Sequence, residues 1–246
     1  AIPRSNLNDV NEAVLAADKA RDNWSSLSLD ERRKWLEKIA NALETRSEEI
    51  AKLESLDTGK PIKIARAVDA SRSVANFRFF AEFSKDFHEQ KFLMEDATNH
   101  VIFKPVGIAG LITPWNLPLY LLSWKIAPAI VMGNTVVAKP SELTPLTANL
   151  LAEVFDEVGL PAGVVNIVHG FGHETGQAIV SHPLVNLISF TGGTITGKKV
   201  AETAAPMFKK LSLELGGKNA TIVLDDVNLD SAIPEIARSG FLNQGK

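Results

Sequence analysis

The chain has 246 residues, of which 45% are hydrophobic and 22% charged, and its formal net charge is -3. This composition is typical of a soluble globular protein, and the length allows one large domain or two modest ones. The weak, interspersed charge gives no electrostatic reason to expect a nucleic acid or a membrane surface as partner. Because cysteine is absent, these residues can form neither a disulfide nor a thiolate metal site.

The N-terminal part of the chain is predicted to be mainly helical. Apolar residues recur there at helical spacing, and capping residues and glycines mark where helices begin and end. The predicted elements, in order, are a helix over 7–23, a helix opened by the capping box Ser28-Leu29-Asp30-Glu31, a helical segment from Ser47 to Gly59, a long helix over about 62–88, and a strand over 100–106.

From residue 107 onward, short apolar runs alternate with helical segments. The predicted strands are 108–112, 135–138, 164–168, 187–190 and 221–224, and the predicted helices are about 119–132, 145–158, 174–180 and 196–205. This alternation favours an α/β fold with a Rossmann-like parallel sheet covered by helices on both faces. We therefore expect a mainly helical segment over 1–106, packed on a Rossmann-like domain over 107–246.

The longest apolar stretch, over 117–132, is interrupted by Ser123 and Lys125 and is too short to predict a membrane span. No secretory signal is visible at the first residue, Ala1. A cytoplasmic protein is the default expectation, and a processed organellar protein remains an alternative.

The stretch Lys210-Leu211-Ser212-Leu213-Glu214-Leu215-Gly216-Gly217 carries the first candidate catalytic residue. Glu214 lies within an alternating apolar run, where partial burial would raise the pKa of its carboxyl toward the range of a general base. The two glycines allow a backbone or a ligand to approach closely. The alternative is a strand end whose glutamate points to solvent.

Three further stretches accompany this one, each after an apolar strand-like run. They are Ile112-Thr113-Pro114-Trp115-Asn116-Leu117-Pro118, Ala138-Lys139-Pro140-Ser141-Glu142 and Phe190-Thr191-Gly192-Gly193-Thr194-Ile195-Thr196-Gly197. In this order, the set resembles the signature of the NAD(P)-dependent aldehyde dehydrogenase superfamily over essentially the whole chain. The runs over 72–81 and 118–129 look most like its aminomuconate-semialdehyde dehydrogenase branch.

The resemblance implies two catalytic residues, with Glu214 as general base and Asn116 as oxyanion donor. A side-chain amide can hold a developing oxyanion, and flanking prolines stiffen the backbone at Asn116. The alternative for Asn116 is an ordinary turn asparagine. The cofactor-binding residues that the resemblance implies are Ile112, Trp115, Lys139, Glu142, Gly172, Gly192, Gly193, Gly197 and Leu215.

Lys139 and Glu142 follow a predicted strand, where open α/β sheets bind ligands. The lysine can donate to a ribose hydroxyl, and the carboxylate can accept from both ribose hydroxyls and repel a 2′-phosphate, which favours NAD over NADP. The alternative is a solvated pair at a helix entrance. The glycine loop can cradle a pyrophosphate at a helix N-terminus, although Gly193 replaces the family's more usual serine.

Gly172 precedes another predicted helix and is nearly as well explained by an ordinary turn. His169, His173 and His182 lack the spacing of metal ligands, so we predict no metal site and expect surface or turn positions for them.

The segment Asn243-Gln244-Gly245 resembles the one that leads to the family's catalytic cysteine, expected two residues beyond Lys246. The resemblance therefore implies a fragment whose parent oxidises an aldehyde, with a semialdehyde as candidate, to a carboxylic acid through a cysteine thiohemiacetal. We expect the chain alone to be inactive. The resemblance also implies a small β-extension that includes the strand over 100–106 and makes the contacts of a homo-oligomer in the complete protein. The alternative is a truncated, non-catalytic NAD-binding or interaction module.

Overall fold

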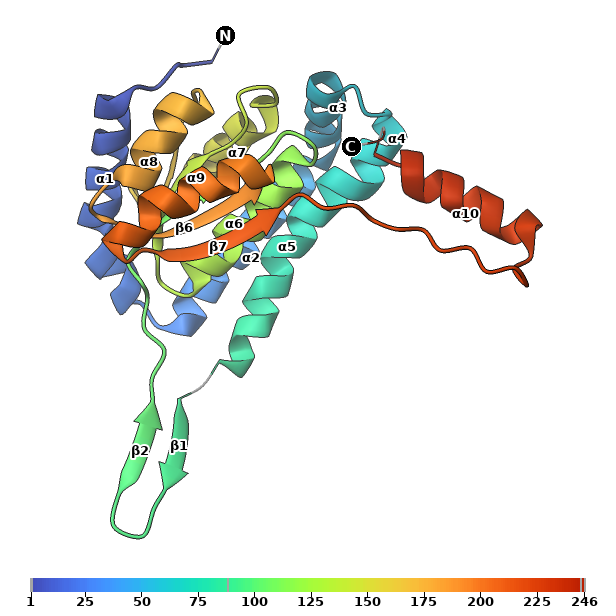
Figure 1. Ribbon diagram of the computed structural model, residues 1–246. Coiled ribbons are helices and arrows are strands. Elements are labelled where there is room, and N and C mark those ends of the chain that lie inside the picture. Colours follow the sequence, from blue (N-terminus) through green and yellow to red (C-terminus); the bar gives the residue numbers. More distant parts are fainter. Residues whose placement is uncertain (1, 88, 244, 246) are drawn as a thin grey trace.

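The computed structural model describes residues 2–87, 89–243 and 245 (Figure 1). Its centre is a parallel sheet in the order β5-β4-β3-β6-β7. The strands are β3 (Ile108–Ile112), β4 (Thr135–Lys139), β5 (Val165–Ile167), β6 (Val185–Gly192) and β7 (Lys210–Leu215). The chain winds outward from β3 to β5 and then returns past β3 to form β6 and β7. This doubly wound order confirms the predicted α/β class.

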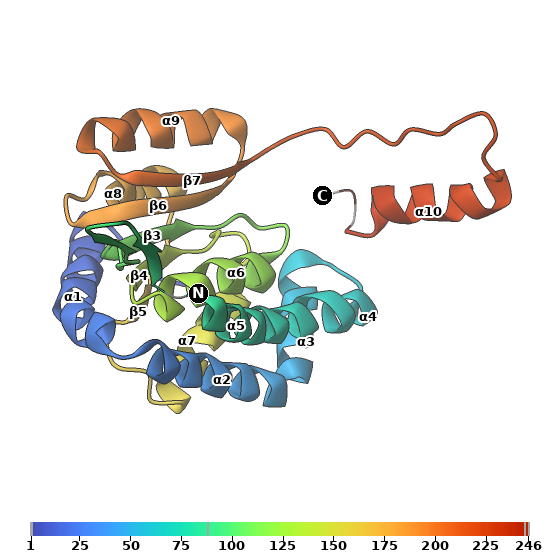
Figure 2. The ribbon, with the colours of Figure 1, turned by 90° about the horizontal axis from the view of Figure 1, so that it is seen from below.

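Helices cover both faces of the sheet (Figure 2). The helices that contact one face are α6 (Pro118–Val131) and α7 (Leu146–Glu157), and those on the other are α1 (Leu7–Ser26), α8 (Gln177–Ser181) and α9 (Thr194–Ala204). The helices α2 (Leu29–Thr45), α3 (Ser47–Thr58) and α5 (Ser71–Phe83) form a further layer outside α6 and α7. Every residue of β3 and β4 is buried because both strands lie between these layers.

The predicted helix boundaries near Ser28 and Gly59 are confirmed. The Ser28 hydroxyl accepts from the backbone amide of Glu31, whose carboxylate accepts from the amide of Ser28, so a capping box opens α2. Gly59 ends α3 with a φ of 73°, a left-handed conformation that glycine adopts without a steric penalty.

The helix predicted over 62–88 is present as one continuous helical segment to Asp86, but it is not a regular α-helix throughout. The chain forms α4 (Ile62–Ile64), the π-helical η1 (Ala65–Ala70), α5, and the 3-10 turn η2 (Ser84–Asp86), while His88 lies outside the described residues. The wide π-helical turn carries Asp69, whose buried carboxylate accepts two hydrogen bonds of 2.7 Å from Lys60 Nζ. The tertiary ion pair therefore accompanies a break in the regular helix.

The β-extension is an antiparallel hairpin of β1 (Gln90–Leu93) and β2 (Thr98–Val101) that projects from the body of the molecule (Figure 1). The predicted strand over 100–106 is therefore shifted, and β1 was not predicted. Strand β2 ends at Val101. This residue pairs with Gln90, the first residue of β1, so no partner residue lies beyond it. All residues of both strands are exposed.

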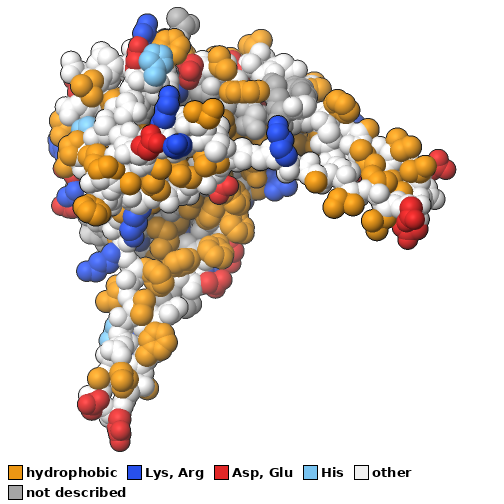
Figure 3. Space-filling view, in the orientation of Figure 1, with side chains coloured by type: hydrophobic (Ala, Val, Ile, Leu, Met, Phe, Trp, Pro, Cys, Tyr) orange, Lys and Arg blue, Asp and Glu red, His pale blue; other side chains and the backbone are white. Residues whose placement is uncertain are grey.

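The predicted strand over 221–224 is also wrong, because the fifth strand of the sheet is β7. After β7 the chain leaves the sheet and returns through α10 (Leu229–Phe241), forming an arm that carries exposed hydrophobic side chains (Figure 3). Ile222 is 82% exposed. An apolar run forms a stable strand only where a neighbouring strand pairs with its backbone, and the described residues provide none here.

The helix predicted over about 145–158 is α7, which begins at Leu146. The Thr144 hydroxyl makes no hydrogen bond within the described residues, and the Leu146 amide donates to Asp57 instead.

Among the helices described, none combines the length and the apolar character needed to span a bilayer. The division of the chain at residue 106 stays a prediction.

Candidate cofactor and catalytic site

The carboxyl ends of the parallel strands meet along one edge of the sheet, and the predicted residues gather there. The strand register pairs Ile112 with Lys139 on one side and with Phe190 on the other. Gly192 pairs with Leu215 at the ends of β6 and β7. Residues that are far apart in the sequence therefore form one continuous edge, with the change of winding direction between β3 and β6.

Lys139 and Glu142 form the polar part of this edge. Lys139 is buried, and its Nζ donates to the Pro140 carbonyl at 2.7 Å and to Glu142 Oε2 at 3.0 Å. Burial lowers the pKa of Lys139, and the bond to Glu142 opposes that shift. Burial would raise the pKa of Glu142, but bonds from its own backbone amide and from Lys139 outweigh it and leave the pKa lowered. The solvated pair considered as an alternative is therefore excluded for Lys139.

The glycine loop lies at the amino end of α9. Gly193 is the N-cap residue, no side chain caps the helix, and nothing lies within 4 Å of the position that a Cβ would take. The first amides of α9 are thus free of a side-chain cap, as an anion site at a helix N-terminus requires. At Gly197 a Cβ would collide with the Leu215 side chain, so this glycine allows α9 to approach β7.

The loop after β5 contributes Gly172, which begins the π-helical turn η3 (Gly172–Gly176), with open space around it. Gly176 was missed by the sequence analysis. A Cβ there would lie 3.6 Å from Lys139 Cδ and 3.9 Å from Ile112 Cδ1, which are ordinary contact distances, so η3 packs directly against this edge of the sheet. The only sequence signal for Gly176 was that a second glycine follows Gly172 after three residues.

Asn116 and Trp115 lie in the loop between β3 and α6. Asn116 is partly buried, and its Oδ1 is buried without a hydrogen-bond partner among the described residues. Its backbone carbonyl accepts a bond of 3.1 Å from Asn243 Nδ2. Trp115 is 40% exposed at the same edge. The backbone at Asn116 is therefore held at the edge, while its side chain carries an acceptor oxygen that no described group uses.

Glu214 is exposed in the described chain, so the prediction that it is partly buried is wrong. It lies in β7, at the outer edge of the sheet, where only β6 pairs with the strand. Its side chain lines a groove of about 360 Å³ between α6 and the sheet, together with Lys125 and Ser189. An edge strand buries less of each side chain than a central strand, which explains the exposure.

Lys125 is a further polar residue of this groove that the sequence analysis did not assign to the site. It is 8% exposed, and its Nζ donates to Ser189 Oγ at 2.7 Å. Burial lowers the pKa of Lys125 to about 8, while the charge of Glu214 acts in the opposite direction. Its place within the otherwise apolar helix over 117–132 was a sequence signal that Lys125 is buried for a reason. The spacing of residues could not show that it lies near Glu214.

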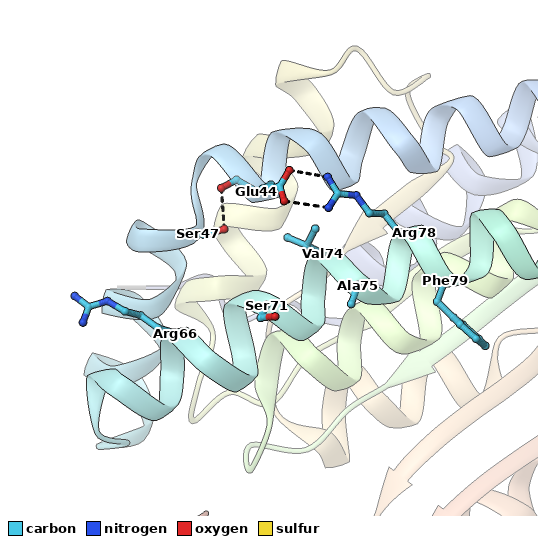
Figure 4. A pocket seen from close by; sticks show the side chains of 8 residues that line it. All are labelled: Glu44, Ser47, Arg66, Ser71, Val74, Ala75, Arg78 and Phe79. Carbon is cyan, nitrogen blue, oxygen red and sulfur yellow. Dashed lines mark hydrogen bonds and ion pairs between the residues drawn. The ribbon is translucent and has the colours of Figure 1, made fainter.

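Another hollow, of about 650 Å³, lies away from this edge, between α5 and the helices α2 and α3 (Figure 4). Arg78 and Glu44 face each other across it, while Arg66 points away and pairs with Glu48. Both arginines are thus already paired. This hollow brings together none of the predicted site residues.

All three histidines lie at surface or loop positions, as predicted, but only one of them is exposed. His169 and His182 are buried, and burial lowers the pKa of each, whereas His173 is exposed. Within the described ranges, no group of histidine, aspartate and glutamate side chains has the geometry of a metal site.

The doubly wound sheet, the helix N-terminus and the Lys139–Glu142 pair define a dinucleotide-binding type of α/β protein. The chain belongs to the aldehyde dehydrogenase family, whose model matches residues 1–246. It is 51% identical to 2-aminomuconic semialdehyde dehydrogenase of Homo sapiens, over 100% of this chain and 51% of that relative. It is 45% identical to 2-hydroxymuconic semialdehyde dehydrogenase of Pseudomonas sp. strain CF600, over 97% of this chain and 50% of that relative.

The fold matches the NAD+ complex of an aldehyde dehydrogenase from Bacillus cereus with a TM-score of 0.95 and 40% identity. That match covers 98% of this chain and 50% of the Bacillus chain. The chain thus spans about half the length of the relatives it matches. The predicted family, and the resemblance to aminomuconate-semialdehyde dehydrogenases, are confirmed.

Proposed function

We propose that this chain forms the cofactor-binding part of an NAD-dependent dehydrogenase that oxidises a semialdehyde to a carboxylic acid. The observation that carries the proposal is the gathering of Lys139, Glu142, Gly192 and Asn116 at one edge of a doubly wound sheet. Family membership and relatives named as semialdehyde dehydrogenases support it.

The residues at this edge fit a nicotinamide dinucleotide. The open space at Gly193 and the uncapped start of α9 suit a pyrophosphate. Lys139 and Glu142 would hold the ribose, and the Glu142 carboxylate, with its lowered pKa, disfavours a 2′-phosphate. Ile112, Trp115, Gly172, Gly197 and Leu215 would complete the walls. When bound, the nicotinamide accepts the hydride of the oxidation.

Asn116 and Glu214 would act on the substrate. The Asn116 amide would donate to the oxygen that becomes negatively charged at the aldehyde carbon, and two flanking prolines limit its movement. Glu214 would accept a proton from the water that releases the acid. Lys125 lies in the same groove and, with its pKa near 8, can exchange a proton with a neighbouring group close to neutral pH.

The nucleophile would come from outside this sequence, because none of its 246 residues is a cysteine. We therefore propose that the chain alone binds the cofactor but does not turn over aldehydes. The segment 243–245 would lead into the nucleophile, although Gln244 lies outside the described residues. The hairpin of β1 and β2, exposed along its whole length, would mediate homo-oligomer contacts.

The test uses the full-length protein with NAD, NADP and a panel of 2-aminomuconic semialdehyde, 2-hydroxymuconic semialdehyde and simple aliphatic aldehydes. We expect NADH formation, with higher kcat/KM for the semialdehydes and for NAD. Asn116→Ala should lower kcat about 100-fold, as expected for the loss of an oxyanion donor. Glu214→Gln should also lower kcat, by about 100-fold for a lost general base.

The control is Glu202→Gln, which removes an exposed carboxylate on α9 paired only with Lys198. It should leave both kcat and KM unchanged. No NAD-dependent oxidation by the full-length protein, or full activity in both site variants, would overturn the proposal. Turnover by the 246-residue chain alone would refute the statement that its nucleophile lies outside the sequence.

A further inference from the structure

The loop after β5 is hydrogen-bonded to a segment that lies far from it in the sequence. Ser5 is buried, and both of its backbone polar groups bond to this loop. Its amide donates to the His169 carbonyl at 2.8 Å, and its carbonyl accepts a bond of 2.6 Å from the Thr175 hydroxyl. These two bonds lie on either side of Gly172 in the sequence, so the loop from His169 to Thr175 closes on Ser5.

The loop leaves room for this contact at a glycine. Gly170 has a φ of 152°, and a Cβ there would lie 2.0 Å from Thr175 Oγ1 and 3.1 Å from the Ser5 carbonyl oxygen. A side chain at position 170 would therefore take the space of the hydroxyl. Thr175 is fully buried, and burying a hydroxyl is costly unless it is hydrogen-bonded. The bond to Ser5 therefore satisfies a group that the fold has removed from water.

Arg4 makes a second contact with the same loop, at its surface. Its Nε donates to Glu174 Oε2 at 2.8 Å, and its Nη2 donates to the other oxygen of that carboxylate. Its guanidinium carbon lies 4.9 Å from the centre of the Phe171 ring. A bidentate pair of arginine and carboxylate fixes the orientation of the two groups. The segment before α1 thus holds the loop by a buried bond and by an exposed ion pair.

The segment that makes these contacts is itself fixed. Asn6 and Asp9 form a capping box at the start of α1. This helix packs against β4 and β5, and its buried Val10 belongs to the same core cluster as Val137 of β4. The contacts to the loop therefore start from a rigid support.

The loop continues through η3, which lies against a residue proposed to hold the ribose. Thr175 is followed by Gly176, where a Cβ would lie 3.6 Å from Lys139 Cδ and 3.9 Å from Lys139 Cε. We propose that Thr175 is a positioning residue: its bond to Ser5 holds η3 against Lys139 and so sets the affinity for the dinucleotide. This inference rests on the proposed function, which assigns Lys139 and Gly172 to cofactor binding.

The test compares Thr175→Val and Thr175→Ser in the full-length protein. Valine has nearly the shape of threonine but cannot donate to the Ser5 carbonyl, whereas serine keeps the hydroxyl. The measurements are calorimetric titration with NAD, NADH formation at saturating NAD, and amide hydrogen exchange over 169–177. Thr175→Val should raise the Kd for NAD about three- to tenfold, as expected for one lost hydrogen bond, and change kcat by less than twofold. Thr175→Ser should restore the wild-type Kd and the slow exchange.

Two control variants separate positioning from a general loss of stability. Thr135→Val makes the same change at a fully buried threonine, at the opposite end of β4 from Lys139. Ser84→Ala removes a bond of 3.0 Å from a buried hydroxyl to the Ala81 carbonyl, next to the hairpin. Both controls should leave the Kd for NAD and the exchange over 169–177 unchanged, whatever their effect on Tm.

A charge swap tests the exposed contact without changing the core. Arg4→Glu places two carboxylates together and should raise the Kd for NAD about two- to fivefold, with faster exchange over 169–177. Adding Glu174→Arg restores an oppositely charged pair and the wild-type net charge, so it should restore both quantities. A Kd that stays raised in the swapped protein would overturn the role of this pair.

The exchange data separate this inference from the proposed function. If the wild-type protein binds neither NAD nor NADP, but Thr175→Val speeds exchange over 169–177 and Thr175→Ser does not, the contact holds the loop as inferred and the proposed function fails. A Thr175→Val protein with the wild-type Kd would overturn the positioning role even in an active dehydrogenase. Equal losses of affinity in Thr175→Val and Thr135→Val would also overturn it.

Discussion

Gly110, at the centre of β3, is expected to be intolerant of even one added methyl group. A Cβ at this position would lie 2.6 Å from Ile179 Cγ2, 2.8 Å from Ile188 Cδ1 and 3.1 Å from Val185 Cγ1. Carbon atoms in good contact are about 3.5–4.0 Å apart, so the first two overlaps are about 1 Å. All three side chains are buried, which leaves them no solvent-filled space to enter.

Gly110→Ala should therefore lower the free energy of unfolding by about 1–3 kcal/mol, the usual cost of overpacking a core. For a chain of this size that corresponds to a fall in Tm of roughly 2–12 °C. Thermal unfolding followed by circular dichroism measures it. Gly217→Ala is the matched control, because nothing lies within 4 Å of its added methyl group and the residue lies outside the helices and strands.

A double-mutant cycle identifies the contact responsible. Ile179→Leu removes the Cγ2 methyl that lies closest to the added Cβ, so it should recover part of the loss and give a coupling energy above about 0.5 kcal/mol. Ile179 belongs to α8, which follows Gly172 and Gly176, so an uncompensated shift would also displace the cofactor edge. A Gly110→Ala protein as stable as Gly217→Ala, or no coupling to Ile179, would refute this packing argument.

Two other substitutions test the site through stability. Stability at position 193 should follow Ser > Gly > Ala with a span of about 1 kcal/mol, because serine supplies an N-cap acceptor to α9 and alanine is a poorer N-cap residue than glycine. Chemical denaturation measures the order, and Ala as the most stable variant would contradict it. Lys125→Met should raise Tm over wild type most at or below pH 8, with the gain shrinking as pH rises from 8 toward 10.5. Burial lowers the pKa of Lys125 to about 8, so the folded state disfavours the charged lysine at low pH. Lys198→Met, at an exposed position, is the control, and an equal slope for both would refute the claim.

The central part of the fold could be predicted because its signals are local. Strands β3 and β4 are buried on both faces, so they appear as continuous apolar runs, and their bounds match the prediction to within one residue. Local signals failed where pairing decides the structure. The run over 221–224 is apolar enough for a strand but has no neighbour, whereas β7 pairs with β6 despite carrying Ser212 and Glu214.

The residues of the candidate site that lie in loops could be predicted from the sequence. The residues that other elements bring to the site could not. Motif residues such as Lys139 and Gly193 follow strand ends, and parallel strands place such positions at one edge. The position of Lys125 beside Glu214 depends on how α6 packs on the sheet, which no short spacing encodes. A buried lysine or glutamate in an otherwise apolar helix is a sequence signal that such a partner exists, but it does not identify the partner.

The groove beside β7 shows how the exposed Glu214 can still serve as a base. Here the buried titratable group is Lys125, and Glu214 remains accessible to water. Any covering of the groove would remove water from both side chains together, and a carboxylate and a lysine in a dry site can exist as an ion pair or, after one proton moves, as a neutral pair. Since burial already brings the pKa of Lys125 to about 8, the two forms become closer in free energy as the groove is covered. In the proposed mechanism, Lys125 is therefore a second site within the same groove for the proton that Glu214 would accept.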